Sequence, residues 1–127
     1  MGREFDALGY NKITTDRELQ WQATKADRFG DVIIGRRDIG ASYHIAVTHD
    51  DAAQGVTHIV RGQDLEAQTD VHVLIQKLLG WPHPVYLHHN LLLREDGQKL
   101  AKRNSDPSIR AQREAGRLPG QIWADIV

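Results

Sequence analysis

The stretch that follows Thr69 restricts the possible folds of this chain more than any other. Thr69 is a suitable N-cap residue, and the apolar residues after it recur at the spacing of one helical face. These residues are Val71, Leu74, Ile75, Leu78 and Leu79. Gly80 stands where a helix commonly ends, and Pro82 cannot continue one. The sequence therefore predicts a helix from Thr69 to Leu79.

Short apolar runs on both sides of this helix predict strands. The predicted strands cover residues 31–35, 42–48, 56–60 and 85–93. The order strand, strand, helix, strand is typical of part of an α/β sheet. We therefore predict an α/β fold with a short mixed or parallel sheet and helices.

The two ends of the chain differ in character. Residues 1–28 are polar and lack clear periodicity, so we expect an irregular N-terminal segment there, followed by one structured part over residues 29–127. Two short helices are predicted near the C-terminus. Their boundaries are marked by Ser105 or Asp106 as a cap, Pro107 at a first position, Gly116 as a stop and Pro119 at the next start.

The composition excludes several classes of protein. The chain has 16 Lys and Arg and 17 Asp and Glu, a net charge of −1, so a nucleic-acid contact would have to use a local patch. The absence of cysteine excludes disulfides, thiolate catalysis and a Cys-ligated zinc. The first residues lack the apolar core of a signal peptide, and no stretch is apolar for long enough to span a membrane. We therefore expect a cytoplasmic protein.

Two lysines three positions apart follow an acidic-glycine turn, in the run Asp96-Gly97-Gln98-Lys99-Leu100-Ala101-Lys102-Arg103. A loop with this spacing can place two ammonium groups along a polyphosphate. Lysine suits that task because it is a compact point charge on a flexible stem. The alternative is a solvated turn whose lysines bind nothing.

Several segments occur in the order and at the close spacing of one known family. They are Arg37-Asp38, Tyr43-His44-x-Ala46-Val47, Asp50-Asp51, Gly55 to Gly62, Leu79-Gly80-Trp81 and Gly97 to Arg103. Together they resemble the second half of the catalytic domain of bacterial glutamyl-tRNA synthetases. The loop at residues 99–103 is similar to KMSKS, the second signature loop of class I synthetases. The resemblance implies part of a Rossmann-like catalytic domain.

Within this family the chain is most similar to the short members that attach glutamate to the queuosine base of tRNA(Asp). His88-His89-Asn90 before Leu91-Leu92, and the brief stretch after Arg103, carry that likeness. The resemblance implies an ATP-dependent ligase that uses Mg²⁺, forms glutamyl-adenylate and transfers glutamate to tRNA. A glutamyl-tRNA synthetase that charges the terminal ribose, discriminating or not, is the alternative.

The resemblance assigns Tyr43 and Arg61 to glutamate. Arg61 is expected at the carboxyl end of a strand, where ligands bind in open α/β sheets, and a guanidinium can grip a carboxylate through two parallel hydrogen bonds. Tyr43 is expected on the neighbouring strand with its hydroxyl toward the same cleft, and His44 should face the other way. The alternatives are core packing for Tyr43 and, for Arg61, an ion pair with an aspartate. The candidate aspartates are Asp38, Asp50 and Asp51.

The other residues that the resemblance assigns serve ATP and tRNA. For ATP they are the catalytic lysines Lys99 and Lys102, at the phosphates, and Leu91 and Leu92, which would contact adenine unless they only pack in the core. Gln63 and Asp64 would lie near the tRNA acceptor or the bound nucleoside, although Asp64 is equally suited to a turn. The seven histidines form no pattern of metal ligands, so we expect no metal site and no zinc site.

One family feature is missing from the sequence. The first signature, His-x-Gly-His, does not occur in the 127 residues. We therefore expect a C-terminal fragment of the catalytic domain that does not catalyse glutamate activation alone, because it would hold the phosphates from one side only. A non-catalytic relative that binds tRNA or a partner is the alternative. A half domain would also expose a sheet edge and an apolar face, which makes self-association a further expectation.

Overall fold

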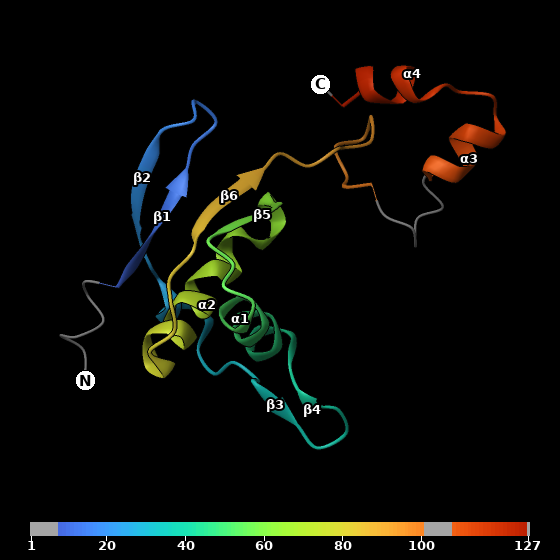
Figure 1. Ribbon diagram of the computed structural model, residues 1–127. Helices are drawn as coiled ribbons and strands as arrows, with labels where there is room; N and C mark the ends of the chain where they lie inside the picture. The colour runs from blue at the N-terminus through green and yellow to red at the C-terminus, as the bar shows by residue number, and fades with distance from the viewer. Residues whose placement is uncertain (1–7, 101–107, 127) are drawn as a thin grey trace. The chain divides into compact units, whose positions relative to one another are not determined.

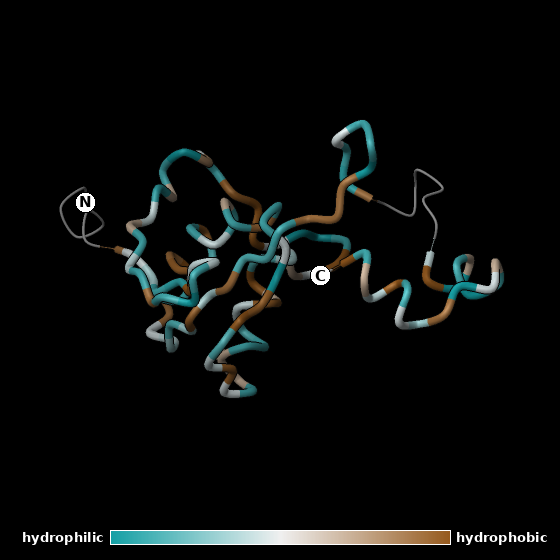
Figure 2. Tube along the Cα trace, turned by 90° about the horizontal axis from the view of Figure 1, so that it is seen from above, coloured by the Kyte–Doolittle hydropathy of each residue, from teal (hydrophilic) through white to brown (hydrophobic). Residues whose placement is uncertain are grey.

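The computed structural model describes residues 8–100 and 108–126, which belong to two compact units (Figure 1). The first unit ends at His89 and the second begins at Asn90. Hydrophobic residues occur in short runs between hydrophilic ones (Figure 2). Within the described ranges, no helix is both long enough and apolar enough to cross a membrane.

A four-stranded sheet is the framework of the first unit, in the order β2-β1-β6-β5. β1 (Gly9–Ile13) and β2 (Leu19–Ala23) form an antiparallel hairpin. β6 (Val85–His89) runs parallel to β1 and to β5 (His58–Gly62), and it is shorter than the predicted strand at residues 85–93. The sheet is therefore mixed. Together with the helices described next, it confirms the predicted α/β fold.

The helices α1 (Tyr43–Ala53) and α2 (Glu66–Leu79) pack against each other in the same unit. The turn η3 (Gln63–Leu65) leads from β5 into α2. The predicted helix is confirmed as α2, and Gly80 ends it in the left-handed conformation, with a φ of 66°. Thr69, the predicted cap, lies inside α2. The core of the unit consists of Leu8, Tyr10, Val73 and Tyr86, with Ile59 and Leu74 packed against it.

The predicted strand at residues 42–48 is wrong, because these residues open helix α1. The residue of α1 that is fully buried, Thr48, is polar. His44 is half-buried, and Thr48 is 1% exposed and donates its hydroxyl proton to the carbonyl of His44 at 2.7 Å. With polar side chains at inward positions, the helix lacks a clear apolar stripe. The alternation of polar and apolar residues at 42–48 therefore resembled the pattern of a strand. Tyr43 and His44 therefore do not lie on opposite faces of a strand.

The N-terminal segment also differs from the prediction of an irregular region. The described part of residues 1–28 forms the hairpin of β1 and β2 and the short helix η2 (Ala26–Phe29). Register pairing along both strands, from Gly9 with Ala23 to Ile13 with Leu19, defines the hairpin. Many of its side chains are polar, so the segment shows little hydrophobic periodicity although it is regular.

The predicted strand at residues 31–35 contributes only its last residue to a strand. β3 (Gly35–Arg36) and β4 (Gly40–Ala41) pair as a small hairpin outside the four-stranded sheet. The amide of Ser42 donates to the carbonyl of Ile34 at 3.1 Å, which closes the base of this hairpin. Ile34 is 50% exposed, so the apolar run that suggested a strand is not a core segment.

In the second unit the chain turns back on itself at residues 92–100. Leu93 and Lys99 face each other in an isolated antiparallel bridge. Gly97 has a φ of 78°, which suits the predicted acidic-glycine turn. The turn thus presents Lys99 just after its tip.

Two short helices follow in this unit. α3 (Ile109–Glu114) begins after Ser108, whose hydroxyl accepts a hydrogen bond from the amide of Ala111 at 3.1 Å. α4 (Pro119–Ala124) begins at the predicted proline. The predicted boundary residues Ser105, Asp106 and Pro107 lie outside the described residues.

Candidate functional site

Arg61 lies near the end of β5, opposite His88 of the parallel strand β6. Its Nε donates to Nε2 of His88 at 3.4 Å, its Nη1 to Nδ1 of His72 at 3.0 Å, and its Nη2 to the hydroxyl of Thr69. The guanidinium also covers the ring of Tyr86, with Cζ 5.2 Å from the ring centroid. Two strand ends and the first half of α2 thus hold one cation in place.

The ring of His72 can be assigned a single protonation pattern. An arginine N–H only donates, so Nδ1 of His72 must carry a lone pair. Nε2 of His72 then carries the proton and donates to Nδ1 of His44, 3.0 Å away. Burial, followed by the charges of Arg61 and His44, lowers the pKa of His72 to about 3. This ring is therefore neutral at physiological pH.

His88 is a second neutral acceptor beside Arg61. Its Nε2 lies 3.0 Å from the hydroxyl oxygen of Thr69, a residue that is fully buried. Because this hydroxyl accepts from Arg61, its own proton can be donated to His88. Burial, followed by the charge of Arg61, lowers the pKa of His88. Arg61 Nε and the Thr69 hydroxyl thus share the single Nε2 lone pair of His88, and all the described hydrogen-bond partners of the guanidinium are uncharged.

Tyr43 reaches the same group of side chains from the first turn of α1. Its ring centroid lies 5.7 Å from that of His72 and 5.8 Å from that of His44. The residue is 51% exposed, so a ligand can reach it. Tyr43 and Arg61 were predicted on neighbouring strands, and that placement is wrong for Tyr43. The two side chains nevertheless both contact His72.

The charge of Arg61 has no carboxylate partner within ion-pair distance in the described part of the chain. Asp38 forms an ion pair with Arg36, and Asp50 contacts the ring of His49. Burial raises the pKa of Asp51 while the charge of Arg61 opposes that rise, but no ion pair joins the two. The alternative prediction, a structural ion pair for Arg61, is therefore not what the described residues form.

These contacts define what we call the Arg61 cluster. Its members are Tyr43, His44, Arg61, Thr69, His72 and His88. A guanidinium has five N–H donors, and the contacts described above use one on each nitrogen. Two donors, one on each terminal nitrogen, are not used by these contacts. A carboxylate can accept both of them and neutralise the charge.

Gln63 and Asp64 lie in η3, directly after β5. Gln63 lines a separate cavity of about 380 Å³ in which Arg28 and Asp70 form an ion pair at 3.0 Å. Both residues follow Arg61 by two or three positions in the chain. Their expected position near tRNA stays a prediction.

The residues predicted for ATP belong to the second unit. Leu91 is half-buried and Leu92 is 46% exposed. Lys99 is exposed in the turn at residues 92–100, and Lys102 lies outside the described residues.

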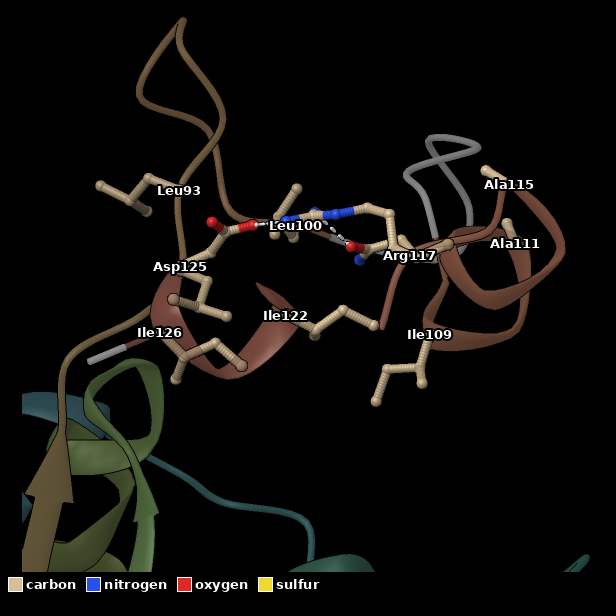
Figure 3. A pocket seen from close by; sticks show the side chains of 11 residues that line it. Leu93, Leu100, Ile109, Ala111, Ala115, Arg117, Ile122, Asp125 and Ile126 are labelled. Carbon is tan, nitrogen blue, oxygen red and sulfur yellow. Dashed lines mark hydrogen bonds and ion pairs between the residues drawn. The ribbon is translucent and has the colours of Figure 1, made fainter. Parts of the chain in front are cut away.

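Leu92 also lines an apolar cavity of about 620 Å³ in this unit (Figure 3). Its other apolar walls come from the 92–100 turn, from α3 and α4, and from the C-terminal side of α4. They include Leu93, Leu100, Ile109, Ile122 and Ile126. Arg117 borders the cavity and donates a hydrogen bond to Asp125 at 2.6 Å (Figure 3). It also donates one to Gln112 at 2.6 Å. Apart from Leu92, none of these cavity residues was predicted as functional.

Sequence reasoning missed four members of the Arg61 cluster in their present roles, since His88 was cited only for the family resemblance. Thr69 was predicted only as a cap, His44 was given no role, and His72 was not considered. One signal was available, because residues three apart on a helix share a face and this places Thr69 beside His72. Within residues 8–100 and 108–126, no three His, Asp or Glu side chains are grouped to hold a metal ion.

Comparison with known proteins shows similarity to one group, the tRNA synthetases for glutamate and glutamine. Residues 11–126 match the family described as tRNA synthetases class I (E and Q), catalytic domain. The chain is 50% identical over 93 residues to the Glutamyl-Q tRNA(Asp) synthetase of Rhodobacter capsulatus. It is 42% identical over 101 residues to the glutamate–tRNA ligase of Aquifex aeolicus. These matches cover 73% and 80% of this chain but 34% and 21% of those proteins.

A solved structure is similar as well. The glutamate tRNA ligase of Elizabethkingia meningosepticum, in complex with its amino acid, matches with a TM-score of 0.59 at 28% identity. The match covers 76% of this chain and 19% of that one. The chain thus spans about a third or less of the length of these three relatives.

Proposed function

This chain belongs to the family of class I tRNA synthetases for glutamate and glutamine, in its catalytic domain, and we propose that it supplies the glutamate site of such an enzyme. In the proposed reaction, an oxygen of the glutamate α-carboxylate attacks the α-phosphorus of ATP. The bond from that phosphorus to the bridging oxygen breaks, and pyrophosphate leaves. The glutamyl group of the adenylate then passes to tRNA, and AMP is released.

The uncompensated charge of Arg61 is the observation that supports this proposal. Its described hydrogen-bond partners are neutral, and two of its five N–H donors are not used by these contacts. The glutamate side-chain carboxylate fits these donors, because the α-carboxylate must remain free to attack phosphorus. Tyr43, beside His72, would add a hydroxyl hydrogen bond to the same ligand. Positioning of this kind lowers the barrier without a covalent nucleophile.

ATP would be bound by the second unit. Lys99 and Lys102 would neutralise the charge that develops on the leaving pyrophosphate, and Leu91 and Leu92 would contact adenine. An ammonium that engages only as this charge grows stabilises the transition state more than the ground state. Mg²⁺ would accompany ATP through the phosphate oxygens. We assign it no protein ligands, since no three suitable side chains are grouped in the described ranges.

For the acceptor we favour the queuosine base of tRNA(Asp). The supporting observation is that proteins named Glutamyl-Q tRNA(Asp) synthetase recur among the relatives, at 50% identity in Rhodobacter capsulatus and 44% in Verminephrobacter eiseniae. Gln63 and Asp64 would then lie near the tRNA or its modified base. The terminal ribose is the second candidate, and the 42% identity to a glutamate–tRNA ligase favours it. A role as a non-catalytic tRNA or partner-binding protein is the third candidate.

Direct binding tests the glutamate site. The 127-residue chain is titrated by NMR with L-glutamate and, separately, with L-glutamine. We expect glutamate to bind more tightly, because a neutral amide cannot satisfy the charge of Arg61. Shifted signals should come from the Arg61 cluster and disappear in Arg61→Ala. Equal affinity for the two amino acids, or unchanged glutamate binding in Arg61→Ala, would rule out the proposed site.

A further inference from the structure

We propose that His72 is a positioning residue, which fixes the guanidinium of Arg61 through its Nδ1 lone pair and leaves the arginine charge free for a ligand carboxylate. The inference rests on the proposed glutamate site and adds the residue that prepares it. His72 would not touch the reacting atoms. It would act through Arg61 alone.

The first argument concerns orientation. Arg61 is a long side chain, and its Nη1 is fixed by one contact only, the 3.0 Å bond to Nδ1 of His72. The other two contacts hold Nε and Nη2. With all three nitrogens held, the planar guanidinium is restrained against rotation about the Cδ–Nε bond of the side chain. The two remaining donors therefore keep fixed directions, which favours binding of one carboxylate over a mobile guanidinium.

The second argument concerns charge. His72 is 1% exposed, and a buried position beside an arginine is one where a carboxylate would form a strong ion pair. A neutral ring gives the same hydrogen bond without neutralising the cation. The electrostatic attraction of Arg61 for an incoming carboxylate is then retained. A negatively charged residue at position 72 would orient Arg61 equally well but would take the place of the ligand.

The third argument concerns the tautomer of His72. Nδ1 can accept from Arg61 only if the ring proton is on Nε2. His44 supplies the acceptor for that proton, with Nδ1 3.0 Å from Nε2 of His72. His44 follows Tyr43 in α1, so one helix turn carries both the residue proposed to contact glutamate and the residue that sets this tautomer. The first turn of α1 therefore positions both Tyr43 and, through His44, the ring of His72.

Four variants separate these effects in the 127-residue chain. His72→Asn keeps an acceptor oxygen close to the position of Nδ1, and His72→Leu removes the acceptor. His72→Asp keeps an acceptor and adds a negative charge. His49→Asn is the matched control, because His49 is an exposed residue of α1 that lies outside the Arg61 cluster. Thermal denaturation shows which variants are folded.

NMR supplies two readouts. Long-range ¹H–¹⁵N spectra of the imidazoles report the tautomer, and we expect the Nε2–H form for His72. The guanidinium signals of Arg61 report whether it is held. We expect them to be resolved in the wild type, His72→Asn, His72→Asp and His49→Asn, and to average in His72→Leu. A resolved, unshifted guanidinium in folded His72→Leu would overturn the positioning role, as would an Nδ1–H tautomer in the wild type.

Glutamate titration of the same variants tests the charge argument. Losing a hydrogen bond to a charged group should weaken glutamate binding about 10- to 100-fold in His72→Leu, and His72→Asn should recover most of it. His72→Asp should bind glutamate worst although Arg61 stays ordered. Wild-type affinity in His72→Asp would refute the charge argument. If the wild-type chain binds no glutamate, the proposed function fails in this chain, while the guanidinium signals still decide whether His72 positions Arg61.

Discussion

The 3.0 Å hydrogen bond between Arg61 and His72 joins a permanent cation to a ring that carries no charge. Buried or half-buried charges are usually paired with an opposite charge, because burial without a partner is unfavourable. In this chain the neighbours of Arg61 satisfy its hydrogen bonds but not its charge. The arrangement lowers the stability of the folded chain and keeps the cation available to a ligand.

Arg61→Ala should impair the use of glutamate far more than the use of ATP. Losing a bidentate charged contact typically costs about 2–5 kcal/mol, which is about 30- to several thousand-fold. ATP–pyrophosphate exchange can be measured in a chimera in which residues 11–126 replace the matching part of the Rhodobacter capsulatus relative. Arg61→Lys, which keeps the charge but not the fork, is the control and should fall in between. An equal rise in the Michaelis constants for glutamate and ATP would contradict the assignment.

Tyr43→Phe should have a smaller effect in the same chimera. Only one neutral hydrogen bond is lost, and such a bond contributes about 0.5–1.5 kcal/mol, so glutamate use should fall about 2- to 12-fold. The ring contact with His72 is kept, at 5.7 Å between centroids in the wild type. Tyr43→Ala removes the ring as well and should be worse. If Tyr43→Phe behaves like the wild type, the hydroxyl has no part in glutamate binding.

In the same chimera, Lys102→Ala and Lys99→Ala should slow adenylate formation and leave glutamate binding nearly intact. The reason is that a phosphate contact in the loop at residues 99–103 acts on the leaving pyrophosphate and not on the amino acid. Single-turnover formation of the adenylate measures the first effect, and glutamate titration measures the second. A large loss of glutamate affinity in either variant would show that the loop does more than bind phosphates.

Acidification from pH 7 to pH 5 should destabilise the first unit. The pKa of His72 is 6.5 when unperturbed and about 3 in the folded chain. Between these values the unfolded chain binds more protons, so stability falls as the pH is lowered. The contribution of His72 should be about 2 kcal/mol between pH 7 and pH 5, and the lowered pKa of His88 acts in the same direction. Urea denaturation at several pH values should show a shallower dependence in His72→Asn, and an unchanged dependence would count against this explanation.

Gly80→Ala should destabilise the first unit by about 1–2 kcal/mol, because an L-residue with a side chain is strained in the left-handed conformation. Gly80 has a φ of 66°, and a Cβ there would meet no other atom, so the effect is conformational and not steric crowding. Gly80→Asn is the control, since asparagine tolerates this conformation better. Denaturant midpoints of the three chains measure the difference. Equal losses in both variants would point to another cause.

Local signals in the sequence predicted those elements whose determinants are local. Helix α2 has an apolar stripe and a glycine stop at Gly80, α4 begins at Pro119, and Gly97 marks a turn. The strand β5 was predicted from its β-branched run, with an error of two residues at each end. In each case the residue type favours the structure whatever surrounds it.

Elements that depend on distant partners could not be predicted in this way. Helix α1 faces inward with His44 and Thr48, so its hydrophobic pattern is uninformative until α2 is placed beside it. The hairpin of β1 and β2 depends on backbone pairing. The Arg61 cluster likewise requires the parallel register that sets Arg61 opposite His88. Chemistry and family resemblance identified Arg61 and Tyr43, but only the fold identifies His72.

The small hairpin of β3 and β4 is pinned at its base, where the amide of Ser42 bonds to the carbonyl of Ile34. Ser42 is also the residue that precedes Tyr43 and α1. We therefore expect a change in the length of the hairpin tip, at residues 37–39, to leave this closing hydrogen bond in place. The tip is exposed, which is where added sequence is tolerated best. It is accordingly a natural attachment point for a fluorophore or an affinity handle that would leave Tyr43 undisturbed.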